Sequence, residues 1–176
     1  LSEPNDPKVA GQLKLLGYSA YLHPVGDGRL LGVGQDATPE GRQLGTQLSL
    51  FDVSDLSRPQ RLSQARVGGQ SSSEVEYDHH AFLYWPPEKL AVLPVNIYDG
   101  RVDPFNGAIG FHVTSSRIDE AGRIDHDESG QQYSPGIRRS LVVGKRLFTL
   151  SDLGVKASTL STLADEAFVP FPVSQS

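Results

Sequence analysis

The chain has 176 residues, a length typical of one domain with its own buried core. Its net charge of −5 comes from interspersed acidic and basic residues, so no concentrated positive field would attract phosphates, and we expect no nucleic acid partner. The absence of cysteine excludes disulfides, thiolate nucleophiles and cysteine-ligated metal sites.

The chain reads as short strands separated by turns, because 18 Gly and 12 Pro punctuate its 176 residues and disfavour long helices. Residues 1–17 are predicted to be the last strand of a preceding unit. Residues 18–69 form the first full unit, with strands predicted at 19–23, 30–35, 46–53 and 60–67. The turn Gly26-Asp27-Gly28 joins its first two strands, since Asp-Gly offers the positive φ that a tight hairpin requires.

Two more units follow with the same organisation. Residues 70–132 are predicted to contain strands at 81–85, 90–98, 108–113 and, weakly, 123–125. Residues 133–176 are predicted to contain strands at 140–143, 147–150 and 155–161 and a last one near Phe168. A helix of about two turns over 160–168 is the alternative for the end of this unit.

Internal repeats support this division. Residues 2–17 match 54–69 without gaps, 29–34 match 89–94 and 146–151, and 48–55 match 108–115. Four strands in roughly 50 to 60 residues is typical of a propeller blade, somewhat longer than the ~40–45 of the WD type. The sequence therefore predicts an all-β fold, a β-propeller fragment of about three four-stranded antiparallel blades within a single partial domain. A sandwich or barrel is the alternative.

Three segments carry a family resemblance: YSAYLHPVGDGRLLGVGQDA, LSLFDVSDLSRPQRLSQARVGG and YDHHAFLYWPPEKLAVLPV. They resemble bacterial secreted proteins with a C-terminal β-propeller domain, which are distantly similar to WD-type repeats. The resemblance is strongest from Gly17 to Val95 and fades after Pro104. It implies a propeller fold and a secreted or cell-surface location, and it supplies no catalytic residues.

The two ends of the chain indicate both a preceding segment and outer sheet faces that need a cover. Because the sequence starts at Leu1 and lacks Met, we expect that a segment preceded it. No run approaches the roughly 18 apolar residues that span a bilayer. A closed propeller needs four to eight blades, so about three blades leave apolar sheet faces open at both ends. We expect missing blades or a homo-oligomer to cover these faces.

One group of side chains suggests a metal site. Asp78, His79 and His80 are adjacent, and His23 ends the corresponding strand one unit earlier. Neutral imidazoles and a carboxylate suit zinc or another divalent ion. Adjacent side chains of a strand point to opposite faces, however, so an extended chain would separate His79 from His80. The alternative is that these residues form hydrogen bonds within a blade.

A second candidate is a calcium loop over residues 99–107, which is rich in oxygen ligands. It lacks the acidic spacing and closing Glu of an EF-hand, and we favour a hairpin connection with Asn106-Gly107 as its tight turn. No Gly-x-Ser-x-Gly motif supports nucleophilic catalysis, and Gly32-Val33-Gly34 has no following helix that would make it a phosphate loop.

Aromatic residues concentrate near the first strands of the first two full units, where packing between blades is the default explanation. The alternative is that some bind a sugar or peptide, and Trp85, Tyr84 and Tyr18 are the candidates, with Trp85 expected at an exposed hairpin tip. We therefore expect a non-catalytic extracytoplasmic scaffold that binds a protein, peptide or glycan. The alternative is a metal-dependent hydrolase that uses the His/Asp group.

Overall fold

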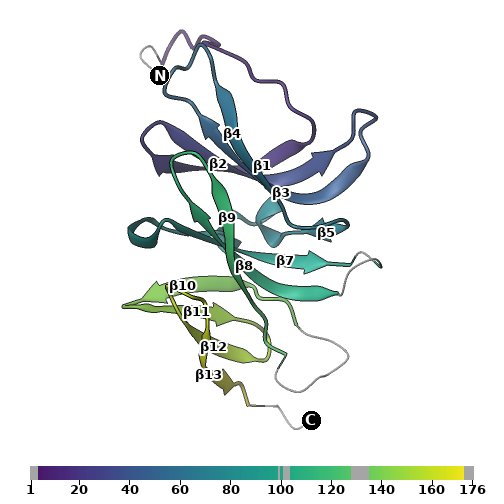
Figure 1. Ribbon diagram of the computed structural model, residues 1–176, viewed down its shortest axis with the longest axis vertical. Coiled ribbons are helices and arrows are strands. Elements are labelled where there is room, and N and C mark those ends of the chain that lie inside the picture. Colours follow the sequence, from purple (N-terminus) through teal and green to yellow (C-terminus); the bar gives the residue numbers. More distant parts are fainter. Residues whose placement is uncertain (1–3, 99, 101–103, 128–134, 173–176) are drawn as a thin grey trace.

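The computed structural model describes residues 4–98, 100, 104–127 and 135–172. Three antiparallel sheets follow one another along the chain and stack along the long axis of the molecule (Figure 1). Strands and short 3-10 turns make up all the regular structure of the described residues, none of which forms an α-helix. The predicted all-β class with three repeated units is therefore confirmed.

The first sheet follows the predicted pattern closely. Its strands are β1 (Tyr18–Gly26), β2 (Arg29–Ala37), β3 (Gln43–Asp52) and β4 (Gln60–Arg66), paired in chain order. Asp27 and Gly28 both have positive φ, 48° and 68°, which confirms the tight turn between β1 and β2. Between residues 4 and 17, all of which are described, there is no strand. The assignment of this segment to a preceding unit stays a prediction.

The second sheet has a divided first strand. Its longer strands are β7 (Leu90–Ile97), β8 (Phe105–Val113) and β9 (Ile118–Ile124), while β5 (Ser71–Ser72) and β6 (Leu83–Trp85) both pair with β7. The 3-10 turns η1 (Glu74–Glu76) and η2 (His79–Ala81) separate β5 from β6, and η3 (Pro86–Glu88) joins β6 to β7. The predicted strand at 81–85 therefore starts late.

The turn predicted at Asn106-Gly107 is wrong. Both residues belong to β8, where Asn106 pairs with Asn96 and Gly107 with Val95 of β7. A Cβ on Gly107 would lie 2.3 Å from the carbonyl oxygen of Ile124 on β9. Glycine is therefore required here by the close approach of the neighbouring strand, not by a turn.

The third sheet consists of β10 (Arg139–Val143), β11 (Arg146–Leu150), β12 (Gly154–Thr159) and β13 (Asp165–Pro170), again paired in chain order. The helix considered for 160–168 is wrong. A turn after β12, with Leu163 at a φ of 57°, returns the chain so that Phe168 pairs with Lys156.

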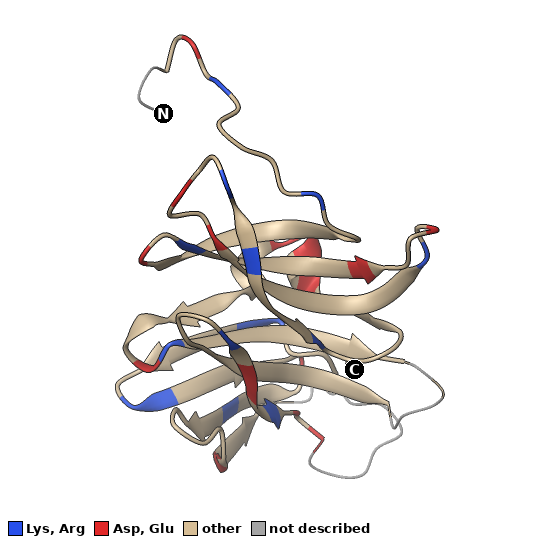
Figure 2. Ribbon diagram, turned by 45° about the horizontal axis from the view of Figure 1, so that its top comes forward, with Lys and Arg blue, Asp and Glu red and all other residues tan. Residues whose placement is uncertain are grey.

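Two apolar cores lie between the sheets. Leu31 and Leu50 of the first sheet share a cluster with Leu93 of β7. Leu90 of the same strand joins Leu147 of the third sheet in a second cluster. The middle sheet is thus buried on both faces, which explains the apolar run Leu90–Val95 of β7. Charged side chains are interspersed over the three sheets (Figure 2).

Candidate ligand cleft and histidine cluster

The first two 3-10 turns of the second unit, η1 and η2, are specified by local capping. The Ser73 hydroxyl accepts a hydrogen bond from the N–H of Val75, and the Glu76 carboxylate accepts one from the N–H of Ser73, which forms a capping box. Asp78 caps the next turn, accepting a hydrogen bond of 3.0 Å from the backbone N–H of His80. Asp78 and the two histidines therefore lie on a tight turn, not on a strand.

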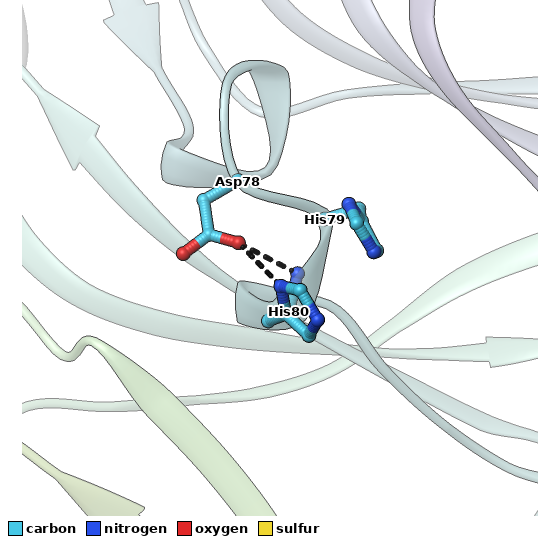
Figure 3. A group of neighbouring side chains, drawn as sticks. All are labelled: Asp78, His79 and His80. Atoms are coloured by element: carbon cyan, nitrogen blue, oxygen red, sulfur yellow. Dashed lines mark hydrogen bonds and ion pairs between the residues drawn. The ribbon is translucent and has the colours of Figure 1, made fainter.

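This turn brings three potential metal ligands together (Figure 3). One ligand atom from each of Asp78, His79 and His80 lies within 4.8 Å of the others, and the two ring centroids are 4.1 Å apart. The separation expected for an extended chain is therefore not observed, because successive residues of a 3-10 turn do not alternate between faces. Asp78 Oδ1 also lies 3.0 Å from His80 Nδ1, and the figure draws this hydrogen bond together with the one to the His80 backbone nitrogen.

Arg139 of β10 links this group to the third sheet. Its guanidinium donates to Asp78 Oδ2 and, at 3.1 Å, to Glu74 Oε1 of η1. The hydrogen bonds from the backbone and ring of His80, together with Arg139, lower the pKa of Asp78 below its usual value. The carboxylate is therefore ionised at neutral pH and in mild acid. Arg139, Glu74 and Asp78 together carry one net negative charge.

His23 is separate from this group. Its ring packs among aromatic rings, with centroid distances of 5.1 Å to Phe82, 5.5 Å to Tyr84 and 5.9 Å to Tyr21. Tyr21 Oη lies 2.9 Å from its Nδ1. Burial lowers the pKa of His23, so its neutral form is favoured in the folded state. Tyr21 also stacks on His79 at 5.9 Å and thereby connects the two groups.

A cleft of about 520 Å³ opens beside the cluster, between the second and third units. Asp78 forms part of its wall, and Tyr77, whose side chain is 78% exposed, lines it as well. The other lining residues are Ser72, Glu74, Pro94, Val95, Asn96, Asn106, Pro135, Gly136, Ile137, Arg138 and Asp152. Sequence analysis missed this cleft, because residues from separate units meet there only after the sheets pack. The Ser73/Glu76 capping box was the one local signal for the turns beside it.

The three aromatic residues considered for binding do not line this cleft. Trp85 is half-buried and packs against the cluster shared with the third sheet, so the expected exposed hairpin tip is wrong. Tyr84 is also half-buried and packs against the core between the first two sheets. Tyr18 is exposed, and its hydroxyl donates to Glu76 Oε2 at 3.1 Å. A binding role for these three residues stays a prediction.

The calcium loop considered at 99–107 lies partly outside the described residues, which include Gly100 and 104–107 of it. No helix in the described part of the chain is long and apolar enough to cross a membrane.

Comparison with known proteins identifies the family. The sequence profile of the β-propeller domain family matches residues 1–163. The chain belongs to the β-propeller domain family. This accords with three successive four-stranded units packed face to face.

Relatives of this β-propeller domain come from archaea. Uncharacterized protein MJ1554 of Methanocaldococcus jannaschii is 32% identical over 151 residues, 86% of this chain and 21% of that protein. An uncharacterized protein of Archaeoglobus fulgidus is 40% identical over 94 residues, 53% of this chain and 14% of that protein. The chain thus spans about a fifth or less of these relatives. The expected bacterial secreted origin is not supported.

Proposed function

We propose that this chain is a non-catalytic binding scaffold whose ligand occupies the cleft between the second and third sheets. The observation that carries the proposal is an exposed aromatic ring, Tyr77, on the wall of a cleft whose other lining residues are a mixture of polar and apolar side chains. Such a site combines a flat apolar surface with a few polar groups that fix orientation, as is usual for small-ligand sites.

The charges around the cleft favour a neutral polar ligand. Arg139 pairs with both Glu74 and Asp78, and Arg138 pairs with Asp152 at 3.2 Å. Since most of the charge is compensated internally, a highly charged peptide or nucleic acid gains little electrostatic complementarity here. Asn96 and Asn106 add amide groups that both donate and accept hydrogen bonds. We therefore propose a glycan as the ligand, in preference to a peptide or protein.

Calorimetric titration with neutral oligosaccharides tests this proposal, with maltotriose, chitotriose and mannotriose as the probes. We expect at least one of them to bind and Tyr77→Ala to abolish the binding. Tyr98→Ala is the matched control, because Tyr98 is 56% exposed but does not line the cleft. Absence of binding by all three sugars, or equal losses in both variants, would contradict the proposal.

The outer face of the third sheet supports a further role in assembly. Strand register aligns Leu141, Phe148, Ala157 and Ala167 in one row across this face. Leu141 is 46% exposed and Val169, in a neighbouring row, 63%. Apolar sheet faces of this kind usually bind a partner. We propose that a further propeller blade covers this face, and that in isolation a second copy of the chain does so.

The outer face of the first sheet is partly covered by the chain itself. Leu13 and Leu15 lie over it and enclose an apolar recess of about 240 Å³ with side chains of the sheet, among them Leu22. Leu22 nevertheless stays half-exposed. This arrangement supports the proposal that residues 1–17 belong to a preceding blade, whose strands would complete the cover.

A metal-dependent hydrolase that uses Asp78, His79, His80 and His23 is the alternative function. It is less favoured because His23 is not among the ligand atoms that lie within 4.8 Å of one another, and because both Asp78 oxygens accept hydrogen bonds from protein groups. A secreted or cell-surface location rests on the family resemblance alone and stays a prediction.

A further inference from the structure

We propose that His79 and His80 bind a late first-row transition-metal dication, and that Asp78 positions His80 without ligating the ion. This assignment goes beyond the scaffold function and does not depend on the ligand of the cleft. It also differs from a four-residue His/Asp site, since it uses two imidazoles and leaves the remaining positions to water.

The hydrogen bond between Asp78 and His80 determines which nitrogen is available. Because an ionised carboxylate only accepts hydrogen bonds, the 3.0 Å contact requires His80 Nδ1 to carry the proton. His80 Nε2 then has a free lone pair, and the His80 ring is exposed. A carboxylate that holds a histidine in this way is the usual outer partner of a metal-binding imidazole, where it orients the ring and raises its basicity.

Asp78 itself is a poor ligand in this arrangement. Its Oδ1 accepts from the backbone and ring of His80, and its Oδ2 accepts from Arg139. To bind the ion it would have to give up one of these interactions. Arg139 in turn is held by Glu74, so the carboxylate is fixed from the side of the third sheet as well.

His79 supplies the second imidazole, and its ring is also oriented. It stacks on Tyr21 with an interplanar angle of 24° and lies next to the ring of His80. One ring nitrogen of His79 lies within 4.8 Å of a ring nitrogen of His80. An ion held by both imidazoles would lie at about 2.0–2.1 Å from each ligating nitrogen.

The local charge favours a cation, and the donor atoms select its class. Neutral imidazoles beside Arg139, Glu74 and Asp78 leave one net negative charge around the site. Nitrogen ligands suit Cu²⁺, Ni²⁺ and Zn²⁺, whereas Mg²⁺ and Ca²⁺ prefer oxygen. The site should bind Cu²⁺ more tightly than Ni²⁺, and it should not bind Mg²⁺ measurably.

Isothermal titration of the untagged chain with NiCl₂ at neutral pH, with MgCl₂ as the negative probe, tests the site. We expect one Ni²⁺ per chain, and affinity at least tenfold weaker in His79→Ala and in His80→Ala. His112→Ala is the control, because His112 lies on β8 outside the cluster. Absence of Ni²⁺ binding, equal binding of Mg²⁺, or a loss as large in the control would overturn the proposal.

The positioning role of Asp78 has its own readout. Asp78→Asn should weaken Ni²⁺ binding about 10- to 100-fold. Long-range ¹H–¹⁵N spectra of the metal-free wild type should report His80 protonated at Nδ1, and the variant should lose this preference. The wild-type spectrum does not depend on the folding of any variant. In that spectrum, addition of Zn²⁺ should shift the ring-nitrogen signals of both His79 and His80. If Asp78→Asn changed neither the His80 tautomer nor the affinity for Ni²⁺, the positioning role would be overturned. If Zn²⁺ left the ring-nitrogen signals of both histidines unshifted, the metal site itself would be overturned.

Discussion

Arg139 of the third sheet and Asp78, which caps the turn η2 of the second unit, form an ion pair that joins the two units beside the histidine cluster. The pair is reinforced by Glu74, which binds the same guanidinium at 3.1 Å. More than a third of the Arg139 side chain is exposed, so solvent screens these interactions. The bridge therefore orients Asp78 more than it stabilises the fold.

Arg139→Ala should accordingly lower the free energy of unfolding by no more than about 1 kcal/mol. The measurement is urea denaturation followed by circular dichroism. Arg138→Ala is the control, because Arg138 pairs with Asp152 within the third unit. It should lower the free energy of unfolding by no more than Arg139→Ala does. A loss above about 3 kcal/mol in Arg139→Ala would mean that the bridge acts as a buried ion pair.

Because the sheets pack face to face, alanine substitution of two leucines of the third sheet should lower the free energy of unfolding by unequal amounts. Leu147 is fully buried in the core shared with the second sheet, whereas Leu141 is 46% exposed on the outer face. Leu147→Ala should lower the free energy of unfolding by about 2–5 kcal/mol, and Leu141→Ala by less than about 1 kcal/mol. Equal losses in urea denaturation would contradict the assignment of inner and outer faces.

The turn between β1 and β2 requires a residue that tolerates a left-handed backbone. Gly28 has a φ of 68°, and a Cβ there would lie 2.9 Å from the Cβ of Ser54. Gly28→Val should lower the free energy of unfolding by about 1–2 kcal/mol. Asp27→Asn should leave thermal stability nearly unchanged, since Asn suits the positive φ of this turn equally well. A stable Gly28→Val would show that the turn can adopt another conformation.

His23 should make stability depend on pH. Burial lowers its pKa below the 6.5 of an exposed histidine, so the unfolded chain takes up the proton first as the pH falls. The stabilising contribution is present above about pH 6.5 and is lost as the pH falls from there toward the folded pKa. His23→Gln should flatten this dependence in urea denaturation between about pH 7.5 and about pH 5.5. A slope unchanged by His23→Gln would exclude His23 as its source.

The apolar outer face predicts self-association of the isolated chain. In sedimentation velocity the wild type should shift toward dimers as its concentration rises, while Leu141→Glu and Val169→Glu should stay monomeric because both alter exposed positions of this face. Val9→Glu is the control, since Val9 is exposed in the N-terminal segment. A wild type that is monomeric at every concentration would count against a second copy as the cover.

The repeated pattern of apolar runs and turns was sufficient to predict the three units, because strand period and turn chemistry are local properties. The Asp27-Gly28 turn is one example. Prediction was less accurate where contacts between strands determine the local conformation. Asn106-Gly107 resembles a turn, but Gly107 is required by the close approach of β9.

The site was only partly predictable for the same reason. Asp78, His79 and His80 are adjacent in sequence, so they were found, but their shared geometry depends on a capped 3-10 turn. The proximity of Arg139 and the exposure of Tyr77 at the cleft depend on packing between units, and no local pattern indicates them.

The most direct test of the account is a ¹H–¹⁵N titration of the chain with the oligosaccharide that binds best. The account predicts that the amide signals that move belong to the seam between the second and third sheets, in particular those of Ser72, Tyr77 and Asn96. Signals that move mainly in the first sheet, or no shifts at saturating sugar, would contradict a ligand cleft at that seam.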